Sequence, residues 1–307
     1  MKIGIIGTGL VGSITAYSLA TAGIAREIIL IDTNKNKALA EALDILHATP
    51  YAYPCRIQAG EYADLENADI VIIAAGVAQI AGENRLALLE RNIEIFRGII
   101  HNIIRYAADS LILVASNPVD LLTAFTQKEA RLPTGRIIGS GTVLDTARFR
   151  TILGAHLNLA PQSVHAYVLG EHGDSEVLVW SAAQAGNMPL DAYAAEAGIP
   201  LNTEIKNHID SEVRNAAYKI IAGKSATYYG IAASITRICK AVFYDENAVL
   251  TVSTHHSEIE GIKDICMSMP TVINRSGVRQ VLYPELSASE HLLLKQSAQK
   301  IHDYIHK

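Results

Sequence analysis

The chain has few cysteines, no excess of positive charge and no long uninterrupted apolar run. Its three cysteines, Cys55, Cys239 and Cys266, are scattered and share no metal-ligand spacing, so we expect neither a disulfide framework nor a metal site. The net charge of -5 gives no basic surface, which argues against nucleic acid as a partner. No window reaches about 18 uninterrupted apolar residues, so we expect no membrane-spanning helix.

The bulk composition is that of a compact globular protein. Half of the 307 residues are hydrophobic and 19% are charged, and this length fits two fused domains. Lys2 followed by the apolar stretch Ile3–Ala20 resembles a secretory signal. Cleavage there would remove the most informative glycines of the chain, so we expect a cytoplasmic protein that does not associate with membranes.

The first 140 residues alternate short apolar runs with longer helical patterns. The runs are rich in Ile and Val at consecutive positions, as in strands buried on both faces. Strand, helix, strand in repetition predicts a doubly wound α/β fold with a parallel sheet over residues 1–140. The expected strands are Lys2–Gly7, Glu27–Ile31, Arg56–Ala59, Asp69–Ala74, Leu111–Ala115 and Arg136–Gly139. The expected helices include Leu10–Ala22, Lys35–His47 and Arg85–Tyr106.

After Gly139 the order of elements becomes mixed, which predicts a second, α+β substrate domain over residues 141–307. No low-complexity linker separates the halves, so we expect a tight join. The expected helices are Leu144–Leu153, Ile205–Ala222 and Ser225–Phe243, and the expected extended segments are Ser163–Leu169 and Ala248–Thr254.

A glycine-rich turn follows the first expected strand. In Gly7-Thr8-Gly9-Leu10-Val11-Gly12, the first glycine permits a tight turn, the second lets backbone approach a pyrophosphate and the third lets helix pack on strand. The helix N-terminus offers N–H groups to the phosphates.

Asp32 ends the second expected strand, where a carboxylate accepts hydrogen bonds from ribose hydroxyls and repels a 2′-phosphate. The pattern therefore predicts a Rossmann domain that binds NAD rather than NADP. The expected cofactor-binding residues are Gly7, Gly9, Val11, Gly12, Asp32 and Asn117.

Polar residues at four further places suggest chemistry, and one of them is Arg85, at the end of the segment Gly76–Asn84. Asp145 and Arg148 share one face of an expected helix. His172 stands in a turn between Gly170 and Gly173, and Asn117 ends a buried strand at the edge where such sheets bind ligands. Each feature alone is typical of an ordinary surface pair or loop, but their order around a dinucleotide motif favours a catalytic set.

These motifs together resemble the L-lactate and malate dehydrogenase family over essentially the whole chain. The matching segments are Gly7–Gly12, Asp32, Ser116–Asp120, Gly139–Arg150 and Gly170–Ser175. The resemblance implies hydride transfer between the nicotinamide C4 of NAD and the C2 of a 2-hydroxy or 2-oxo acid. It also implies a homotetramer.

The family pattern implies a role for each polar residue. His172 is the expected proton donor to the substrate carbonyl, because imidazole titrates near working pH. Asp145 is expected to orient the His172 ring, and Arg148 to bind the substrate carboxylate through a planar fork. Arg85 is expected to polarise the carbonyl once the Gly76–Glu90 segment closes and expels water.

Two further residues match family positions near the substrate. Asn117 corresponds to a residue beside the nicotinamide and the substrate oxygen, and its bond to Pro118 is a candidate cis peptide. Thr227 corresponds to a position that lines the substrate pocket.

The choice between lactate and malate depends on Gln79, six residues before Arg85. Malate dehydrogenases carry arginine at this position and lactate dehydrogenases carry glutamine. Without a cation, the second carboxylate of oxaloacetate would lie unpaired in a dry site, at a cost of roughly 3–5 kcal/mol. Gln79 therefore favours pyruvate and L-lactate.

Three alternatives to this activity stay open. Malate dehydrogenase is the first. The apolar Ala78, Ile80 and Ala81 around Gln79 are compatible with bulkier 2-oxo acids, as in a branched-chain 2-hydroxyacid dehydrogenase. The third is a non-catalytic NAD-binding protein, which would have no need of the catalytic set.

Two weaker features complete the pattern. Arg150 and His165 occupy positions where many bacterial relatives bind fructose 1,6-bisphosphate, so this effector is a candidate partner. His255-His256 resembles a metal-binding dipeptide without a third ligand at suitable spacing, and we expect it to lie in a polar loop.

Overall fold

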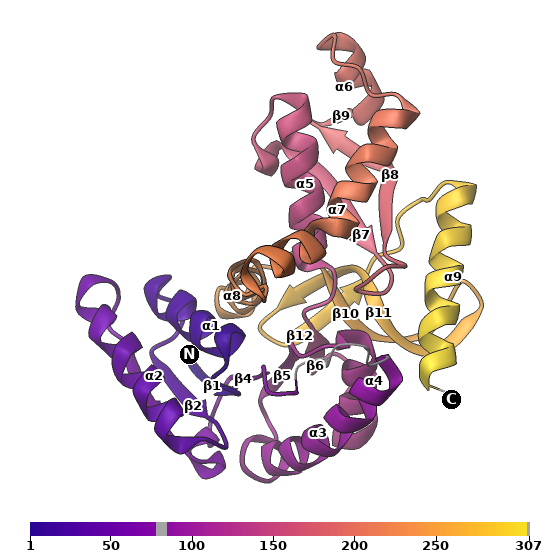
Figure 1. Ribbon diagram of the computed structural model, residues 1–307. Coiled ribbons are helices and arrows are strands. Elements are labelled where there is room, and N and C mark those ends of the chain that lie inside the picture. Colours follow the sequence, from indigo (N-terminus) through magenta and orange to yellow (C-terminus); the bar gives the residue numbers. More distant parts are fainter. Residues whose placement is uncertain (78–84, 306–307) are drawn as a thin grey trace.

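The computed structural model describes residues 1–77 and 85–305, with the side chains of helix α3 described from residue 89 onward. Two sheets organise this part of the chain (Figure 1). The larger has nine strands in the order β12-β11-β10-β6-β5-β4-β1-β2-β3, and the smaller has three in the order β7-β8-β9.

The first half of the chain forms a parallel, doubly wound sheet, which confirms the predicted fold class. All six predicted strands are present, and β1 lies between β2 and β4 with Ile3 paired to both Ile28 and Ile70. The strands are β1 (Lys2–Ile6), β2 (Glu27–Ile31), β3 (Arg56–Ala59), β4 (Ile70–Ile73), β5 (Leu111–Val114) and β6 (Ile137–Gly139).

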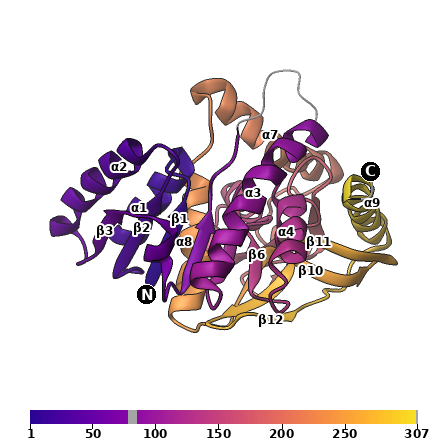
Figure 2. The ribbon, with the colours of Figure 1, turned by 90° about the horizontal axis from the view of Figure 1, so that it is seen from below.

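Helices cover both faces of this sheet. Helices α3 (Arg85–Ala107) and α4 (Val119–Ala130) lie side by side on one face (Figure 2). On the other face, α1 (Leu10–Thr21) packs against α8 (Tyr229–Phe243), and α2 (Lys35–Ala48) adjoins them.

Alternate strand residues enter two separate hydrophobic cores. Ile70 and Ile72 of β4 belong to the core beneath α1 and α8, whereas Val71 and Ile73 belong to the core beneath α3 and α4. Because successive side chains of a strand point to opposite faces, a strand between two helical layers must be apolar at every position. This explains the continuous apolar runs of the sequence.

The sequence analysis placed the parallel sheet within residues 1–140, but the sheet continues beyond β6. Three antiparallel strands from the second half extend it, and Ser253 of β10 pairs with Gly139 of β6. A Cβ on Gly139 would lie 2.9 Å from the Cβ of Ser253 and 2.3 Å from the Oγ1 of Thr123, so this junction requires glycine. The added strands are β10 (Ala248–Ile259), β11 (Ile262–Asn274) and β12 (Gly277–Val281).

The expected polar loop at His255-His256 is wrong. Both residues lie within β10, which is longer than the predicted Ala248–Thr254, and pair with Cys266 and Ile265 of β11. The imidazole of His256 is buried and bonds to the carbonyl oxygen of Met267 at 3.1 Å. The pairing with β11, which lies outside the local pattern, places His256 in the interior.

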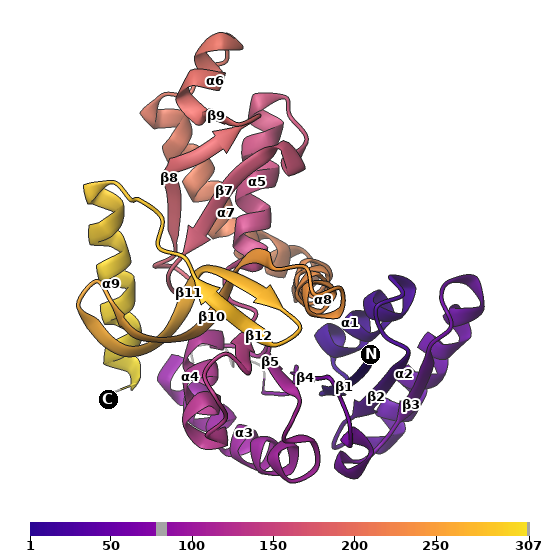
Figure 3. The ribbon, with the colours of Figure 1, turned by 180° about the vertical axis from the view of Figure 1, so that it is seen from behind.

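The smaller sheet lies with α5, α6 and α7 in a separate layer, toward the top of the views in Figures 1 and 3. Its core includes Phe149 and Leu153 of α5, Val164 and Val168 of β7, and Trp180 of β8 at its margin. The elements are α5 (Val143–Leu157), β7 (Val164–Leu169), β8 (Val177–Ala185), β9 (Met188–Pro189), α6 (Leu190–Glu196) and α7 (Thr203–Lys224).

The C-terminal helix α9 (Ala288–Ile305) packs along β8 and β11 and so connects the two sheets (Figure 3). Three short 3-10 turns complete the described elements: η1 (Thr49–Tyr51), η2 (Tyr62–Leu65) and η3 (Pro161–Ser163). No helix within residues 1–77 and 85–305 is long and apolar enough to cross a membrane.

Candidate active site

The glycine-rich turn between β1 and α1 has the geometry that a pyrophosphate site needs. Gly7 has φ +97°, and a Cβ there would lie 2.5 Å from the backbone nitrogen of Ala75. A Cβ on Gly12 would lie 1.9 Å from the carbonyl oxygen of Gly7. The Cβ position of Gly9, at the start of α1, meets no atom within 4 Å. The backbone is therefore closely packed at Gly7 and Gly12, whereas the Cβ position of Gly9 is open. Val11, in the first turn of α1, is partly buried.

Asp32 follows β2 and is held by four donors, of which the Thr33 hydroxyl, 3.4 Å from Oδ1, is the most distant. Its Oδ2 accepts hydrogen bonds from the backbone nitrogen and the hydroxyl of Thr8, at 2.8 and 2.9 Å, and its Oδ1 accepts one from the backbone nitrogen of Asn34 at 2.9 Å. Partial burial raises the pKa of Asp32, but these donors lower it below the ordinary value. The residue is thus an anion oriented beside the glycine turn. The sequence analysis did not identify Thr8 as its partner.

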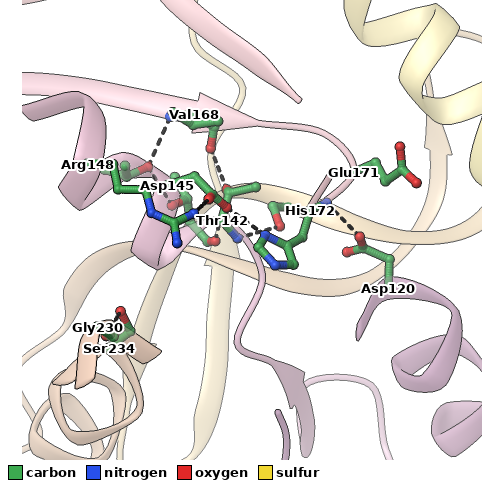
Figure 4. Close-up of polar contacts among 12 residues, drawn as sticks. Asp120, Thr142, Asp145, Arg148, Val168, Glu171, His172, Gly230 and Ser234 are labelled. Carbon is green, nitrogen blue, oxygen red and sulfur yellow. Dashed lines mark hydrogen bonds and ion pairs between the residues drawn. The ribbon is translucent and has the colours of Figure 1, made fainter. Parts of the chain in front are cut away.

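The catalytic candidates His172, Asp145 and Arg148 form one connected chain (Figure 4). Nδ1 of His172 is 2.6 Å from Oδ2 of Asp145, and Nη1 of Arg148 donates to Oδ1 of the same carboxylate at 2.7 Å. Asp145 lies in the first turn of α5 and Arg148 one turn later, on the same face as expected. The Asp145 side chain is 2% exposed, whereas that of His172 is 26% exposed.

The surroundings of Asp145 and His172 determine the protonation state of each side chain. Burial raises the pKa of Asp145, but His172 and Arg148 lower it below its usual value. Burial lowers the pKa of His172, but Asp145, Asp120 and Glu176 together raise it to about 9. The imidazole is therefore protonated at neutral pH, with Nε2 free of the bond to Asp145.

The backbone of His172 is held by a residue that the sequence analysis left without a role. Asp120, in the first turn of α4, accepts a hydrogen bond from the backbone nitrogen of His172 at 2.7 Å (Figure 4). Burial raises the pKa of Asp120 to about 6, although this hydrogen bond opposes the rise. Asp120 lies three residues after Asn117 in a segment already recognised as a motif, and this was the available signal.

Hydroxyl groups attach α5 to the strand that leads to His172. Thr142 donates from its hydroxyl to the carbonyl oxygen of Val168 at 2.5 Å, and the backbone nitrogen of Val168 donates to Thr146 at 2.9 Å (Figure 4). The backbone nitrogen of Thr142 donates to Ser268 of β11 at 3.0 Å. These bonds fix Asp145 relative to His172 although 27 positions separate them.

A cavity of about 190 Å³ opens beside these residues. Its described lining comes from the turn after β5, from α5, from the loop after β7 and from α7. Asn117 and Pro118 form one wall, and the bond between them is cis, as the sequence analysis suggested. The lining also includes one face of α7, with Arg214, Ala217, Tyr218 and Ile221.

Comparisons with known proteins agree with this geometry. A family model for the lactate/malate dehydrogenase NAD binding domain matches residues 1–139, and one for the alpha/beta C-terminal domain matches residues 142–307. The chain belongs to the lactate/malate dehydrogenase family. The chain is therefore an NAD-dependent oxidoreductase, and we propose that the glycine turn and Asp32 form its NAD site.

Individual relatives within the family are similar over nearly their whole length. The L-lactate dehydrogenase of Thermus aquaticus is 50% identical over 97% of this chain and 96% of its own. That of Allorhizobium ampelinum is 49% identical over 99% and 98%. The solved minor L-lactate dehydrogenase of Enterococcus mundtii superimposes with a TM-score of 0.96 at 40% identity, over 99% of this chain and 97% of that one.

Three residues expected from the family pattern are not among the described residues that line the cavity. Gln79 lies outside the described residues, and Arg85 begins α3 although its side chain is not among those described. Thr227 lies in the partly buried segment between α7 and α8 and is absent from the described lining.

The two candidate effector residues lie away from this cavity. Arg150 donates from Nε to the carbonyl oxygen of Ala166 at 2.9 Å, and its guanidinium stacks 5.2 Å from the centre of the Tyr167 ring. His165 precedes Ala166 on β7 and is exposed.

Proposed function

We propose that this chain catalyses the reversible NADH-dependent reduction of pyruvate to L-lactate. The observation that carries the proposal is the continuous chain of His172, Asp145 and Arg148 on one cavity wall. It places a proton donor beside a cation suited to a carboxylate, and a 2-oxo acid presents a carbonyl oxygen next to a carboxylate. The family membership and the names of the relatives support the same activity.

In this mechanism His172 supplies the proton. Its Nδ1 is engaged by Asp145, which leaves Nε2 to donate to the carbonyl oxygen of the substrate. NADH, when bound, supplies the hydride to C2. Asp145 keeps the ring in one orientation and stabilises the imidazolium until the proton leaves. In lactate oxidation, neutral His172 takes the hydroxyl proton back.

Arg148 binds the substrate carboxylate. The guanidinium of Arg148 donates one N–H, from Nη1, to Asp145, and the Arg148 side chain is 14% exposed. The remaining donors are available for a paired, planar contact that lysine cannot make. We assign Arg85 to polarising the carbonyl, Asn117 to contacting nicotinamide and substrate, and Thr227 to the pocket wall, all by family position.

Substrate choice can be tested by one parallel assay. NADH oxidation is followed with pyruvate, oxaloacetate and 2-oxoisocaproate at equal enzyme concentration. We expect pyruvate to give the highest kcat/KM. Equal or better turnover of oxaloacetate would indicate a malate dehydrogenase, and preference for 2-oxoisocaproate a branched-chain enzyme. Turnover of none of the three would favour a non-catalytic NAD-binding protein.

The contribution of Gln79 has its own test. Gln79→Arg supplies the cation that the second carboxylate of oxaloacetate lacks, and the penalty of roughly 3–5 kcal/mol corresponds to about two to three and a half powers of ten in discrimination. We expect the ratio of kcat/KM for oxaloacetate to that for pyruvate to rise toward this range. Gln79→Asn, which adds no charge, is the control. An unchanged ratio in Gln79→Arg would contradict our account of specificity.

We further propose that the protein is cytoplasmic, acts in glycolysis and forms a homotetramer. We also propose that it binds fructose 1,6-bisphosphate at Arg150 and His165. The three buried free thiols are compatible with a reducing compartment. The exposure of His165 and the family positions of both residues support the effector site. Sedimentation equilibrium tests the tetramer, and pyruvate turnover with and without the bisphosphate tests the effector.

A further inference from the structure

Glu176 is a buried acid on the substrate cavity that the mechanism above does not use. The residue is 4% exposed and lines the cavity together with Asp145, Arg148 and His172. Its Oε1 has no hydrogen-bond partner within the described part of the chain. A buried carboxyl group in this state is costly when ionised, because nothing replaces the water it has lost.

Neither of the two described arginines that line the cavity pairs with the carboxyl group of Glu176. Arg148 donates to Asp145 at 2.7 Å. Arg214 donates to both carboxylate oxygens of Asp210, at 2.5 and 3.2 Å, and to the backbone oxygens of Asp174 and Glu176, at 3.1 and 2.6 Å. Arg214 thus holds the main chain of Glu176 in place while leaving its carboxyl group without an ion pair.

The charge of the cavity therefore depends on Glu176. Ionisation of Glu176 adds one negative charge beside the cations Arg148, Arg214 and His172. Asp145 and Asp210 are already bonded to these cations, so an anionic substrate then meets an additional repelling charge. Protonation of Glu176 removes that charge and favours binding of a monocarboxylate.

We propose that Glu176 is a positioning residue whose protonation is linked to binding of the 2-oxo acid: the substrate carboxylate binds beside Arg148 when Glu176 is neutral and is repelled when Glu176 is ionised. The inference rests on the proposed function. It adds a proton-binding group distinct from His172, whose proton is consumed in the reaction.

Titration supports the geometric argument. Burial, together with the Asp145 carboxylate, raises the pKa of Glu176 to about 8, against the opposing effects of His172, Arg214 and Arg148. Substrate affinity therefore changes in the range where cells operate. Among the described residues, the titratable and charged groups around Glu176 come from four elements. Its own loop contributes His172 and Asp174, and α5 contributes Asp145 and Arg148. Helix α7 contributes Asp210, Arg214 and Tyr218, and Asp120 of α4 lies beside His172.

The test measures binding of oxamate, an amide isostere of pyruvate that cannot accept a hydride, to the enzyme saturated with NADH. Calorimetry in two buffers of different ionisation enthalpy gives both the Kd and the number of protons taken up. The variant is Glu176→Gln, which keeps the shape and removes the charge. Glu212→Gln, the same change on α7 at a carboxylate bonded to Lys219, is the matched control.

From pKa values of about 8 for Glu176 and about 9 for His172, we expect the wild-type Kd to rise roughly fivefold between pH 7 and pH 8.5, chiefly because proton loss from Glu176 removes the binding-competent form. In Glu176→Gln the rise is expected to be less than about twofold, from His172 alone. Proton uptake at pH 8 should fall in the same variant, and Glu212→Gln should behave as the wild type.

One result would overturn the inference, namely an equal pH dependence of the oxamate Kd in the wild type and Glu176→Gln. If the Kd of the variant differs by the same factor at every pH, Glu176 has a structural role only. Failure of the proposed function is distinguishable, since it is the absence of pyruvate turnover by the wild type at pH 7, whatever the outcome with oxamate.

Discussion

The cofactor edge and the substrate cavity are built by different means. At the cofactor edge, the decisive atoms belong to the backbone between β1 and α1, and Asp32 is only one strand away. At the cavity, the decisive atoms are side chains from α4, α5, the loop after β7 and α7. A backbone site needs glycines at fixed spacing, so it leaves a local pattern in the sequence. A side-chain site needs the whole fold to bring its members together.

This contrast implies that substitutions in the two regions alter different kinetic quantities. Changes at the cavity are expected to affect kcat and pyruvate binding, and changes at the glycine turn to affect NADH binding. Three substitutions test the separation.

The largest effect is expected from His172→Gln. Glutamine retains a polar side chain but cannot deliver a proton, and loss of general acid catalysis costs typically 10²–10⁴-fold in rate. We expect kcat for pyruvate reduction to fall by about this factor. The Kd of NADH, measured by fluorescence titration, should stay within about twofold of the wild type, as its site is formed by other residues. A comparable loss of NADH affinity would show that the two regions are not separate.

A smaller effect, with the opposite pattern, is expected from Gly12→Ala. The added Cβ would lie 1.9 Å from the carbonyl oxygen of Gly7, so the turn must shift, at a cost of about 1–3 kcal/mol. We expect the Kd of NADH to rise by roughly five- to 150-fold, while kcat at saturating NADH changes little. Gly98→Ala in α3, where a Cβ meets no atom within 4 Å, is the control for a glycine substitution elsewhere. Unchanged NADH binding in Gly12→Ala would contradict the assignment of the turn.

The smallest effect is expected from Thr8→Val, which removes the hydroxyl bond to Asp32 and keeps the backbone bond. One neutral donor to a carboxylate contributes about 1.5–3 kcal/mol of binding free energy at most. Asp32 is partly exposed, so solvent replaces part of the lost hydrogen bond. We expect a several-fold rise in the Kd of NADH and no change in pyruvate KM. Stopped-flow measurement of NADH binding gives this Kd. A change in the pyruvate KM with no change in the Kd of NADH would contradict the assignment of Thr8 to the cofactor region.

The same contrast explains what the sequence could predict of the fold. The six parallel strands were predictable because burial on both faces makes each of them apolar throughout. Strands β11 and β12 and helix α9 were not predicted. Segments of β11 such as Asp264 to Ser268 mix charged, apolar and polar residues, and only pairing with β10 makes them a strand.

Prediction of the site had a similar limit. The positions of His172, Asp145 and Arg148 followed from motifs, and the structure places all three in contact. Thr8, Asp120 and Glu176 were not assigned, because their roles depend on partners that are distant in sequence or on the lack of any partner. Gln79 and Arg85 stay predictions from family position.

The pairing of Ser253 with Gly139 has a mechanical consequence. The strand that ends the NAD-binding half is bonded to a strand of the other half, and Thr142 is bonded to both Thr251 and Ser268 just beyond it. A rotation of one half against the other would break these bonds together. The separation between the glycine turn and the imidazole of His172 is therefore a fixed dimension of the scaffold, and any adjustment to bound molecules must take place in elements at its rim.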